Sequence, residues 1–132
     1  MKEKIINYRR ERAKETLEEA KIMFDNSKLF ATVNRIYYAI FYEAVALLLT
    51  KGLYSSKHSG IRSLFNREFV KTGIVGEEFG DFYNKMFEFR QRGDYEDLVE
   101  FNKEDIKTWL EKAEEFIKVT DEIVVNAIEE QK

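Results

Sequence analysis

The stretch from residue 34 to residue 49 constrains the fold more than any other part of the chain. It reads NRIYYAIFYEAVALLL, contains neither glycine nor proline, and is too long for an unbroken strand. Its apolar residues point in nearly every direction around a helix of roughly five turns, which is typical of a helix enclosed in a bundle. A membrane span needs about 20 apolar residues, and Arg35 and Glu43 interrupt the run. The stretch therefore predicts the central helix of a small soluble bundle.

Apolar residues at helical spacing recur before and after this stretch. We expect helices over residues 3–26, 29–51, 57–71, from Glu77 to Gly93, and from Asn102 to about residue 128. Their inward faces are predicted to carry Ile6, Arg10, Ala13, Leu17, Ala20, Phe24, Ile61, Leu64, Phe65, Phe69, Phe79, Phe82, Tyr83, Met86, Phe87, Ile106, Trp109, Leu110, Ala113, Phe116, Ile117, Thr120, Val124 and Ala127. The pattern predicts one all-α domain over residues 1–132, an up-and-down bundle of four or five helices.

Turn and cap residues lie between these predicted helices. Asn26 with Ser27, then Gly52, Gly73 and Gly93, are expected to end the first four helices, and the last of these begins a polar loop. Ser55 and Ser56 are candidates for the N-cap of the third helix. Asn102, followed by Asp105 three residues later, predicts the N-cap and acidic first turn of the fifth.

Composition excludes several classes of site. The chain has no cysteine and one histidine, so a zinc site is not expected, and we predict no metal and no cofactor. The net charge of −3 gives no overall attraction to nucleic acid, although it allows a local basic patch. Asp94, Glu96 and Asp97 follow one another closely beside a glycine, which favours a solvated loop over a metal site. The charged N-terminus, with no apolar run behind it, predicts a cytoplasmic protein without a signal peptide.

Arg90 is the most informative charged residue, because it falls on the apolar stripe of the fourth helix, four residues after Met86. A guanidinium on an inward face must be paired, since an unpaired buried charge is very costly. Asp94 is its nearest candidate partner, and Tyr95 follows. The arrangement is either a clamp that ties the fourth helix to the second or a binding or catalytic group at a dimer seam.

Two further groups of polar residues stand out. On the central helix, Arg35, Ala39 and Tyr42 line up at helical spacing with Tyr38 beside them, as a solvated seam or a surface for a partner. His58 is the one side chain suited to acid–base chemistry near neutral pH, although a structural role on its apolar face is the simpler interpretation.

A basic cluster near the N-terminus contains Arg9, Arg10 and Arg12. It is either a solvated helix end or a contact for a phosphate or an acidic partner.

Three strings, taken in order, carry a resemblance to a known family. They are Arg35-x-Tyr37-Tyr38-Ala39-x-Phe41-x-x-Ala44, then Lys57-His58-Ser59-Gly60, then Arg90-x-Arg92-x-Asp94-Tyr95 before a long last helix. Together they resemble the HEPN superfamily (higher eukaryotes and prokaryotes nucleotide-binding), in its small stand-alone UPF0332 type. The resemblance covers residues from about 8 to 125.

This resemblance implies a helical bundle that commonly forms homodimers and is often paired with a minimal nucleotidyltransferase as half of a toxin–antitoxin system. Many members are metal-independent ribonucleases, whose motif is an arginine followed, after four to six residues, by a histidine. Here the corresponding positions hold Tyr95 and its successors, and none of them is histidine. The motif matches imply binding positions at Arg35, Tyr38, Arg90, Arg92, Asp94 and Tyr95.

The leading hypothesis is therefore a non-catalytic or weakly catalytic HEPN-type bundle that binds a nucleotide or a partner protein. The first alternative is a metal-independent ribonuclease that uses His58 and Arg90, which requires the two side chains to reach the same substrate atoms. The second alternative is a structural adaptor. RNA or a nucleotide and a second copy of the chain are the other expected partners, and no membrane contact is expected.

Overall fold

The computed structural model describes the backbone of residues 2–95 and 101–132, and the side chains of residues 2–91 and 101–132. Within these ranges the chain is helical and contains no strand, which confirms the predicted all-α bundle. The elements are α1 (Lys2–Asp25), α2 (Leu29–Leu49), α3 (His58–Phe65), η1 (Asn66–Val70), α4 (Glu77–Tyr95) and α5 (Lys103–Glu130).

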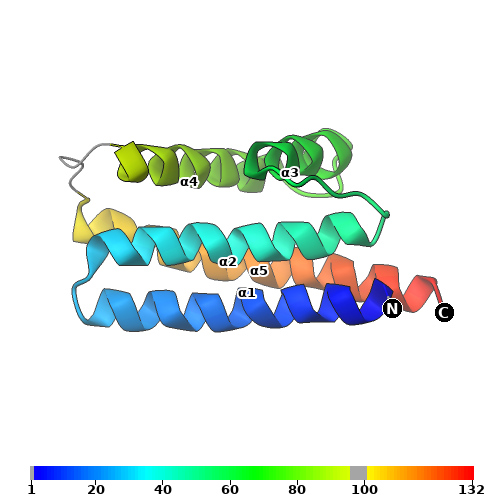
Figure 1. The fold of residues 1–132 in the computed structure, drawn as a ribbon, viewed down its shortest axis with the longest axis horizontal. Helices are drawn as coiled ribbons and strands as arrows, with labels where there is room; N and C mark the ends of the chain where they lie inside the picture. Colours follow the sequence, from blue (N-terminus) through cyan, green and yellow to red (C-terminus); the bar gives the residue numbers. More distant parts are fainter. Residues whose placement is uncertain (1, 96–100) are drawn as a thin grey trace.

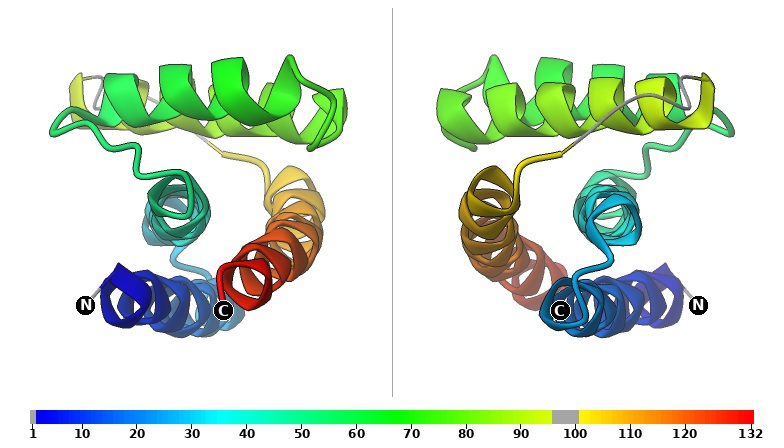
Figure 2. Two further views of the ribbon diagram at one scale, coloured as in Figure 1. Left: turned by 90° about the vertical axis from the view of Figure 1, so that its right-hand side faces the viewer. Right: turned by 90° about the vertical axis from the view of Figure 1, so that its left-hand side faces the viewer.

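The helices lie in two groups. Figure 1 shows α1, α2 and α5 running alongside one another, and in Figure 2 these three are seen nearly end-on while α3 and α4 cross above them. Helix α2 packs against α1, α3, α4 and α5, as expected of the central helix. The chain ends lie at one end of the bundle, where Lys132 Nζ is 3.6 Å from Glu3 Oε1.

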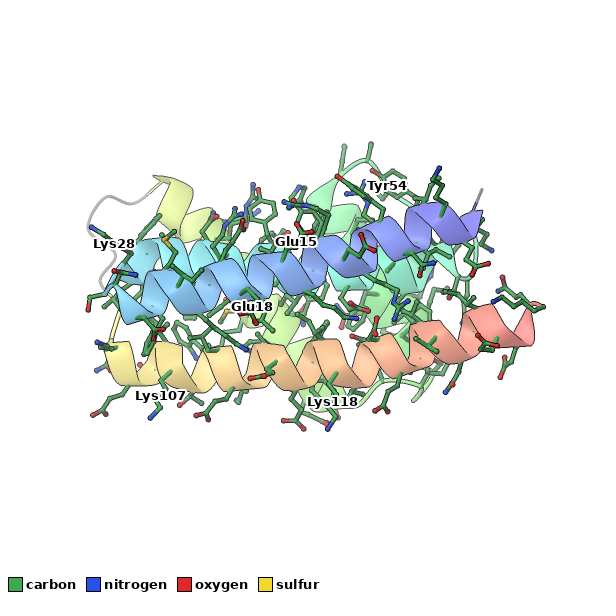
Figure 3. The ribbon with its side chains drawn as sticks, turned by 90° about the horizontal axis from the view of Figure 1, so that it is seen from below. Glu15, Glu18, Lys28, Tyr54, Lys107 and Lys118 are labelled. Atoms are coloured by element: carbon green, nitrogen blue, oxygen red, sulfur yellow. The ribbon has the colours of Figure 1, made fainter. Side chains whose placement is uncertain are left out.

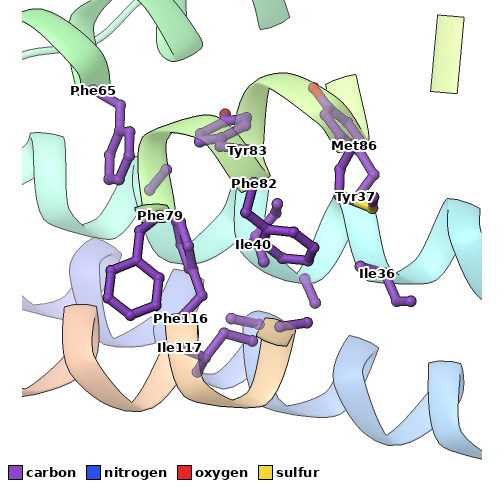
Figure 4. Packing of buried hydrophobic residues seen from close by; sticks show 14 of the residues in the cluster. Ile36, Tyr37, Ile40, Phe65, Phe79, Phe82, Tyr83, Met86, Phe116 and Ile117 are labelled. Atoms are coloured by element: carbon purple, nitrogen blue, oxygen red, sulfur yellow. The ribbon is translucent and has the colours of Figure 1, made fainter. Parts of the chain in front are cut away.

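Aromatic and branched side chains from α2, α3, α4 and α5 fill the space between the two groups (Figure 4). Tyr37, Phe65, Tyr83 and Phe116 are all fully buried there, and each buried side chain of this size contributes about 1.5–3 kcal/mol. The predicted inward faces are confirmed at nearly every position. Arg10, Phe24, Leu64 and Ala127 are only partly buried, and Ile128 is buried in addition to the predicted set.

The predicted ends of α1, α2 and η1 are confirmed by left-handed backbone at Ser27, Gly52 and Gly73, whose φ angles are 58°, 70° and 80°. After α2, the backbone N–H of Gly52 donates to Leu49 O at 3.0 Å. Asn102 caps α5 as predicted, because its side chain accepts hydrogen bonds from the backbone N–H groups of Glu104 and Asp105.

The third predicted helix differs from the expected single element over residues 57–71. It begins at His58 with Lys57 as the N-cap, so the predicted serine cap is wrong; Ser55 Oγ instead accepts a hydrogen bond from the Lys57 N–H at 3.2 Å. From Asn66 the backbone widens into the π-helical η1. The Asn66 side chain donates to Arg62 O at 3.0 Å, and such side-chain bonding to a preceding carbonyl disturbs regular helix.

The predicted break of the fourth helix at Gly93 is also wrong, since α4 continues to Tyr95. One glycine costs a helix only about 1 kcal/mol, and packing can exceed that amount. Met86 and Phe87 are buried in the preceding turns and hold this end of α4 against the bundle. Glu96 and Asp97, with the expected polar loop, lie outside the described residues.

Candidate functional site

An aromatic cluster lies where α2 meets the start of α3. The ring of His58 stacks on Phe41 with 4.2 Å between centroids and an interplanar angle of 9°. The Tyr37 hydroxyl and His58 Nδ1 form a hydrogen bond of 2.9 Å, in which either atom is the donor according to the histidine tautomer. The edge of Tyr38 closes the cluster, with its centroid 5.7 Å from that of His58. His58 is therefore held in one orientation by three rings of α2.

Burial sets the protonation of this cluster. Tyr37 is fully buried, and burial raises its pKa well above the ordinary value, so its hydroxyl stays protonated. Burial, and then the charge of Arg90, lower the pKa of His58 below 6.5. At pH 7 His58 is consequently a neutral imidazole that can donate or accept a proton.

Arg90 lies on the buried stripe of α4 and points toward α2, as predicted. Its Nη2 donates a hydrogen bond of 3.2 Å to the Tyr38 hydroxyl. Its Cζ is 5.3 Å from the Tyr37 ring centroid and 5.5 Å from that of Tyr38. The guanidinium therefore ties α4 to α2, and the residue as a whole is half-buried.

Arg35 is a second arginine close to Tyr38. Its Cζ lies 5.2 Å from the Tyr38 ring centroid, and its Nη1 is 3.3 Å from Glu19 Oε1 on α1. Arg35 and Tyr38 are both half-buried, whereas Ala39 is fully enclosed. The predicted polar stripe of α2 is thus partly exposed and lies next to Arg90.

The basic cluster near the N-terminus divides between two surroundings. Arg12 and Arg9 lie over the Tyr42 ring, at 5.3 and 6.0 Å from its centroid. We call Arg9, Arg12, Arg35, Tyr38, Tyr42 and Arg90 the cation–tyrosine face. Arg10 turns inward instead, and its Nε and Nη2 donate to the carboxylate of Asp121 on α5 at 2.7 and 2.9 Å.

The structure thus brings together four of the predicted site residues, Arg35, Tyr38, His58 and Arg90. The side chains of Arg92, Asp94 and Tyr95 lie outside the described residues, so their roles stay predictions. Sequence reasoning did not assign a role to Tyr37, although it is part of the first string. Tyr37 lies in the apolar stretch from residue 34 to residue 49, and that pattern gave no sign that its hydroxyl would contact His58.

Glu43 is a second buried polar group to which the sequence assigned no role. It is 0% exposed, and as a carboxylate neither of its oxygens meets a hydrogen-bond donor within the described residues. Burial, and then a hydrogen bond with Asp121, raise its pKa to about 9. Burial alone would raise the pKa of Asp121, but hydrogen bonds from Arg10 and Glu43 lower it. At pH 7 Glu43 is therefore a protonated, neutral acid whose O–H donates a hydrogen bond to the Asp121 carboxylate.

Among the described residues, no helix is both long and apolar enough to cross a bilayer. Likewise, no three carboxylate, imidazole or thiol side chains of that part converge as a metal site would require. Guanidinium groups pair with phosphates and carboxylates, and tyrosine rings stack with aromatic bases.

The fold and site define a small all-α domain with an arginine–tyrosine–histidine site between α2, α3 and α4. Residues 6–123 match the family model of the HEPN domain, and the chain belongs to this family. Within it the chain is of the UPF0332 type, because a UPF0332 protein of Thermotoga maritima is 56% identical over 93% of each chain.

Two similar proteins come from Methanocaldococcus jannaschii. The one named "Putative toxin MJ0142" is 34% identical over 88% of this chain and 79% of its own length. The one named "Putative toxin MJ0605" is 43% identical over 63% of this chain and 62% of its own length. The chain therefore resembles proteins named as toxins over much of its length.

Proposed function

We propose that this HEPN domain is the toxin-type half of a toxin–antitoxin pair and that it binds RNA or a nucleotide at the cation–tyrosine face. The main support is that Arg35 and Arg90 both lie within 6 Å of the Tyr38 ring centroid, as does the ring of neutral His58. Guanidinium groups pair with phosphate oxygens, and a base stacks on tyrosine without regard to its identity. The toxin names of the relatives support the same proposal.

The remaining residues of the face extend this site across α1. Arg9 and Arg12 lie over Tyr42, and the centroid of Tyr42 is 6.1 Å from that of Tyr38. Cations and rings therefore alternate from α1 to α4, although the chain carries a net charge of −3. Such alternation suits a single strand, whose phosphates and bases follow one another in the same way.

Binding of a fluorescent single-stranded oligoribonucleotide, followed by anisotropy, tests the proposal. We expect Arg90→Ala and Tyr38→Ala each to raise Kd by about tenfold, since a stacked base contributes ~1–3 kcal/mol. Lys118→Ala is the matched control, because this exposed lysine lies on the outer side of α5 (Figure 3). Equal affinity of wild type, Arg90→Ala and Tyr38→Ala would overturn the proposal and favour the structural adaptor.

We also propose that the partner protein is a minimal nucleotidyltransferase and that the domain acts as a homodimer. Family membership and the toxin names of the relatives support this part. Co-expression with the product of the adjacent gene should give a complex that survives gel filtration. Sedimentation of the domain alone measures its own oligomeric state, and a monomer at all concentrations would contradict the homodimer.

A metal-independent ribonuclease is a second candidate, because His58 and Arg90 both lie within 6 Å of the Tyr37 and Tyr38 rings. When Nδ1–H of His58 donates to Tyr37, Nε2 is free to take the proton of a ribose 2′-hydroxyl. The 2′-oxygen then attacks phosphorus, and a 2′,3′-cyclic phosphate forms as the 5′-oxygen departs and takes up a proton. Arg90 would stabilise the charge that develops on the phosphate.

Cleavage of RNA in the presence of EDTA tests this candidate. His58→Ala and Arg90→Ala should abolish the activity, and an RNA with 2′-deoxyribose at the cut position should resist. Cleavage that needs a divalent metal, or that survives His58→Ala, would exclude this mechanism. The proposal that the domain binds RNA would still stand.

A further inference from the structure

An apolar hollow lies where α1 turns into α2. It has a volume of about 540 Å³ and is lined by Met23, Leu29, Phe30 and Ala31, with Lys28, Asn34 and Arg35 at its rim. This volume accommodates one or two large side chains. The hollow is separate from the aromatic cluster around His58, but it shares Arg35 with the cation–tyrosine face.

The aromatic wall of the hollow is exposed. Phe30 is 48% exposed in the first turn of α2, yet its ring is held in place by Phe101, whose centroid is 6.0 Å away. An aromatic ring that is fixed but left open to water can bury further apolar area on binding without losing much side-chain freedom. Exposed apolar surface with a polar rim is typical of a protein interaction site.

The charged residues that line the hollow are Lys28 and Arg35, and Arg35 also pairs with Glu19 on α1 at 3.3 Å. Lys28 is exposed at the α1–α2 turn, at one end of the bundle in Figure 3, and Arg35 lies five residues beyond Phe30 on α2. A rim with two cations favours a partner that carries carboxylates beside its apolar side chains. The described part of the chain offers no strand edge for an extended peptide, which leaves a helix as the fitting form of that partner.

We propose that this hollow docks an acidic amphipathic helix of a partner protein. One or two large apolar side chains of that helix enter the hollow, and its carboxylates pair with Lys28 and Arg35. Because Arg35 also contacts Tyr38 at the candidate site, the docked helix would compete with a phosphate for the same guanidinium. The docking of the helix does not depend on the proposed function, whereas the competition with a phosphate rests on it.

Selection from a displayed library of random helical peptides tests the docking. Peptides selected on the wild-type protein should carry Asp or Glu beside Leu, Phe or Trp spaced three or four residues apart. Their Kd, measured by anisotropy without RNA, should rise about tenfold for Phe30→Ala and for Lys28→Glu. Lys107→Glu makes the same charge change at an exposed position on α5 (Figure 3) and should alter Kd by less than about twofold.

Three results would overturn the docking proposal: a library that yields no binder, binders that are basic, or binders indifferent to both Phe30→Ala and Lys28→Glu. Sedimentation adds a fourth, since a wild-type dimer that Phe30→Ala converts to monomer would show that a second copy covers the hollow. RNA binding is measured without peptide, so failure of the docking and failure of the proposed function are distinguishable. Added peptide should displace RNA from the wild type only if both are correct.

Discussion

Two polar clusters interrupt the apolar interior, and they differ at one position: the first contains the fully buried Glu43, whereas its Arg10 and Asp121 are half-buried like His58 and Arg90 of the second. Glu43, Arg10 and Asp121 join α2, α1 and α5, and Glu43 has no contact with water. His58 and Arg90 join α3 and α4 to α2 and are only half-buried. The enclosed cluster has its charges satisfied internally, so its role is to hold three helices together. In the open cluster Arg90 donates a hydrogen bond to the neutral Tyr38 hydroxyl and belongs to the face where we propose that a ligand binds.

The largest expected effect is a change in the free energy of unfolding with pH, caused by Glu43 in the enclosed cluster. Because the pKa of Glu43 is raised from 4.5 to about 9, the unfolded chain releases this proton at lower pH than the folded protein. The free energy of unfolding should therefore fall as pH rises between these two values, on the order of 3 kcal/mol over about three pH units. Below pH 6.5 His58, with its lowered pKa, changes stability in the opposite sense.

Glu43→Gln isolates this contribution, because the amide keeps the volume and can donate to Asp121 without a titrating proton. Urea unfolding at pH 5 and pH 8 should show the variant and wild type nearly equal at the lower pH. At pH 8 the variant should be the more stable protein. A wild-type stability that changes with pH in parallel with that of Glu43→Gln would contradict the assignment.

The next prediction compares the loss of stability on replacing one arginine from each cluster, Arg10 and Arg90. Arg10→Ala leaves Asp121 without its two strongest hydrogen bonds, at 2.7 and 2.9 Å. Since Arg10 is only 20% exposed, we expect a loss of ~2 kcal/mol, somewhat below that of a fully buried pair. Arg90→Ala should cost less in urea unfolding but more in RNA affinity. The reverse order would mean that the open cluster is the structural one.

A smaller effect on stability is expected when the hydroxyl groups of two buried tyrosines, Tyr37 and Tyr83, are removed in turn. Tyr37→Phe removes the hydrogen bond to His58 Nδ1 and should cost about 1 kcal/mol. Tyr83 is the matched control, because it is also fully buried but its hydroxyl meets no partner among the described residues. Tyr83→Phe should therefore be neutral or stabilising. Equal melting temperatures for the two variants would show that the Tyr37–His58 bond contributes nothing.

The smallest expected effect is a shift in the titration of His58. As the chain's one histidine, it gives an unambiguous imidazole resonance in NMR. We expect a pKa below 6.5, and Arg90→Gln should raise it, because the positive charge of Arg90 disfavours the imidazolium. Lys118→Gln removes a charge of the same sign on the outer side of α5 (Figure 3) and should leave the titration unchanged.

The helices and their inward faces were predictable, because helical spacing of apolar residues is a local property of the chain. The same spacing placed Arg10 and Arg90 on inward faces, and the structure confirms both directions. Turn chemistry predicted Gly52, Gly73 and Asn102 correctly. It failed at Gly93, because packing of the preceding turns of α4 outweighed one glycine, and at Ser55, because the N-cap position fell to Lys57.

Sequence by itself determined that this chain is an all-α bundle around residues 29–49, and it marked Arg35, Tyr38, His58 and Arg90 as candidates. Only the tertiary structure decided their partners. Tyr38, 52 residues away in the sequence, accepts a hydrogen bond from Arg90, and Asp121, 111 residues away, accepts one from Arg10. Helical periodicity fixes the direction in which a side chain points, whereas the packing of distant helices fixes what it meets.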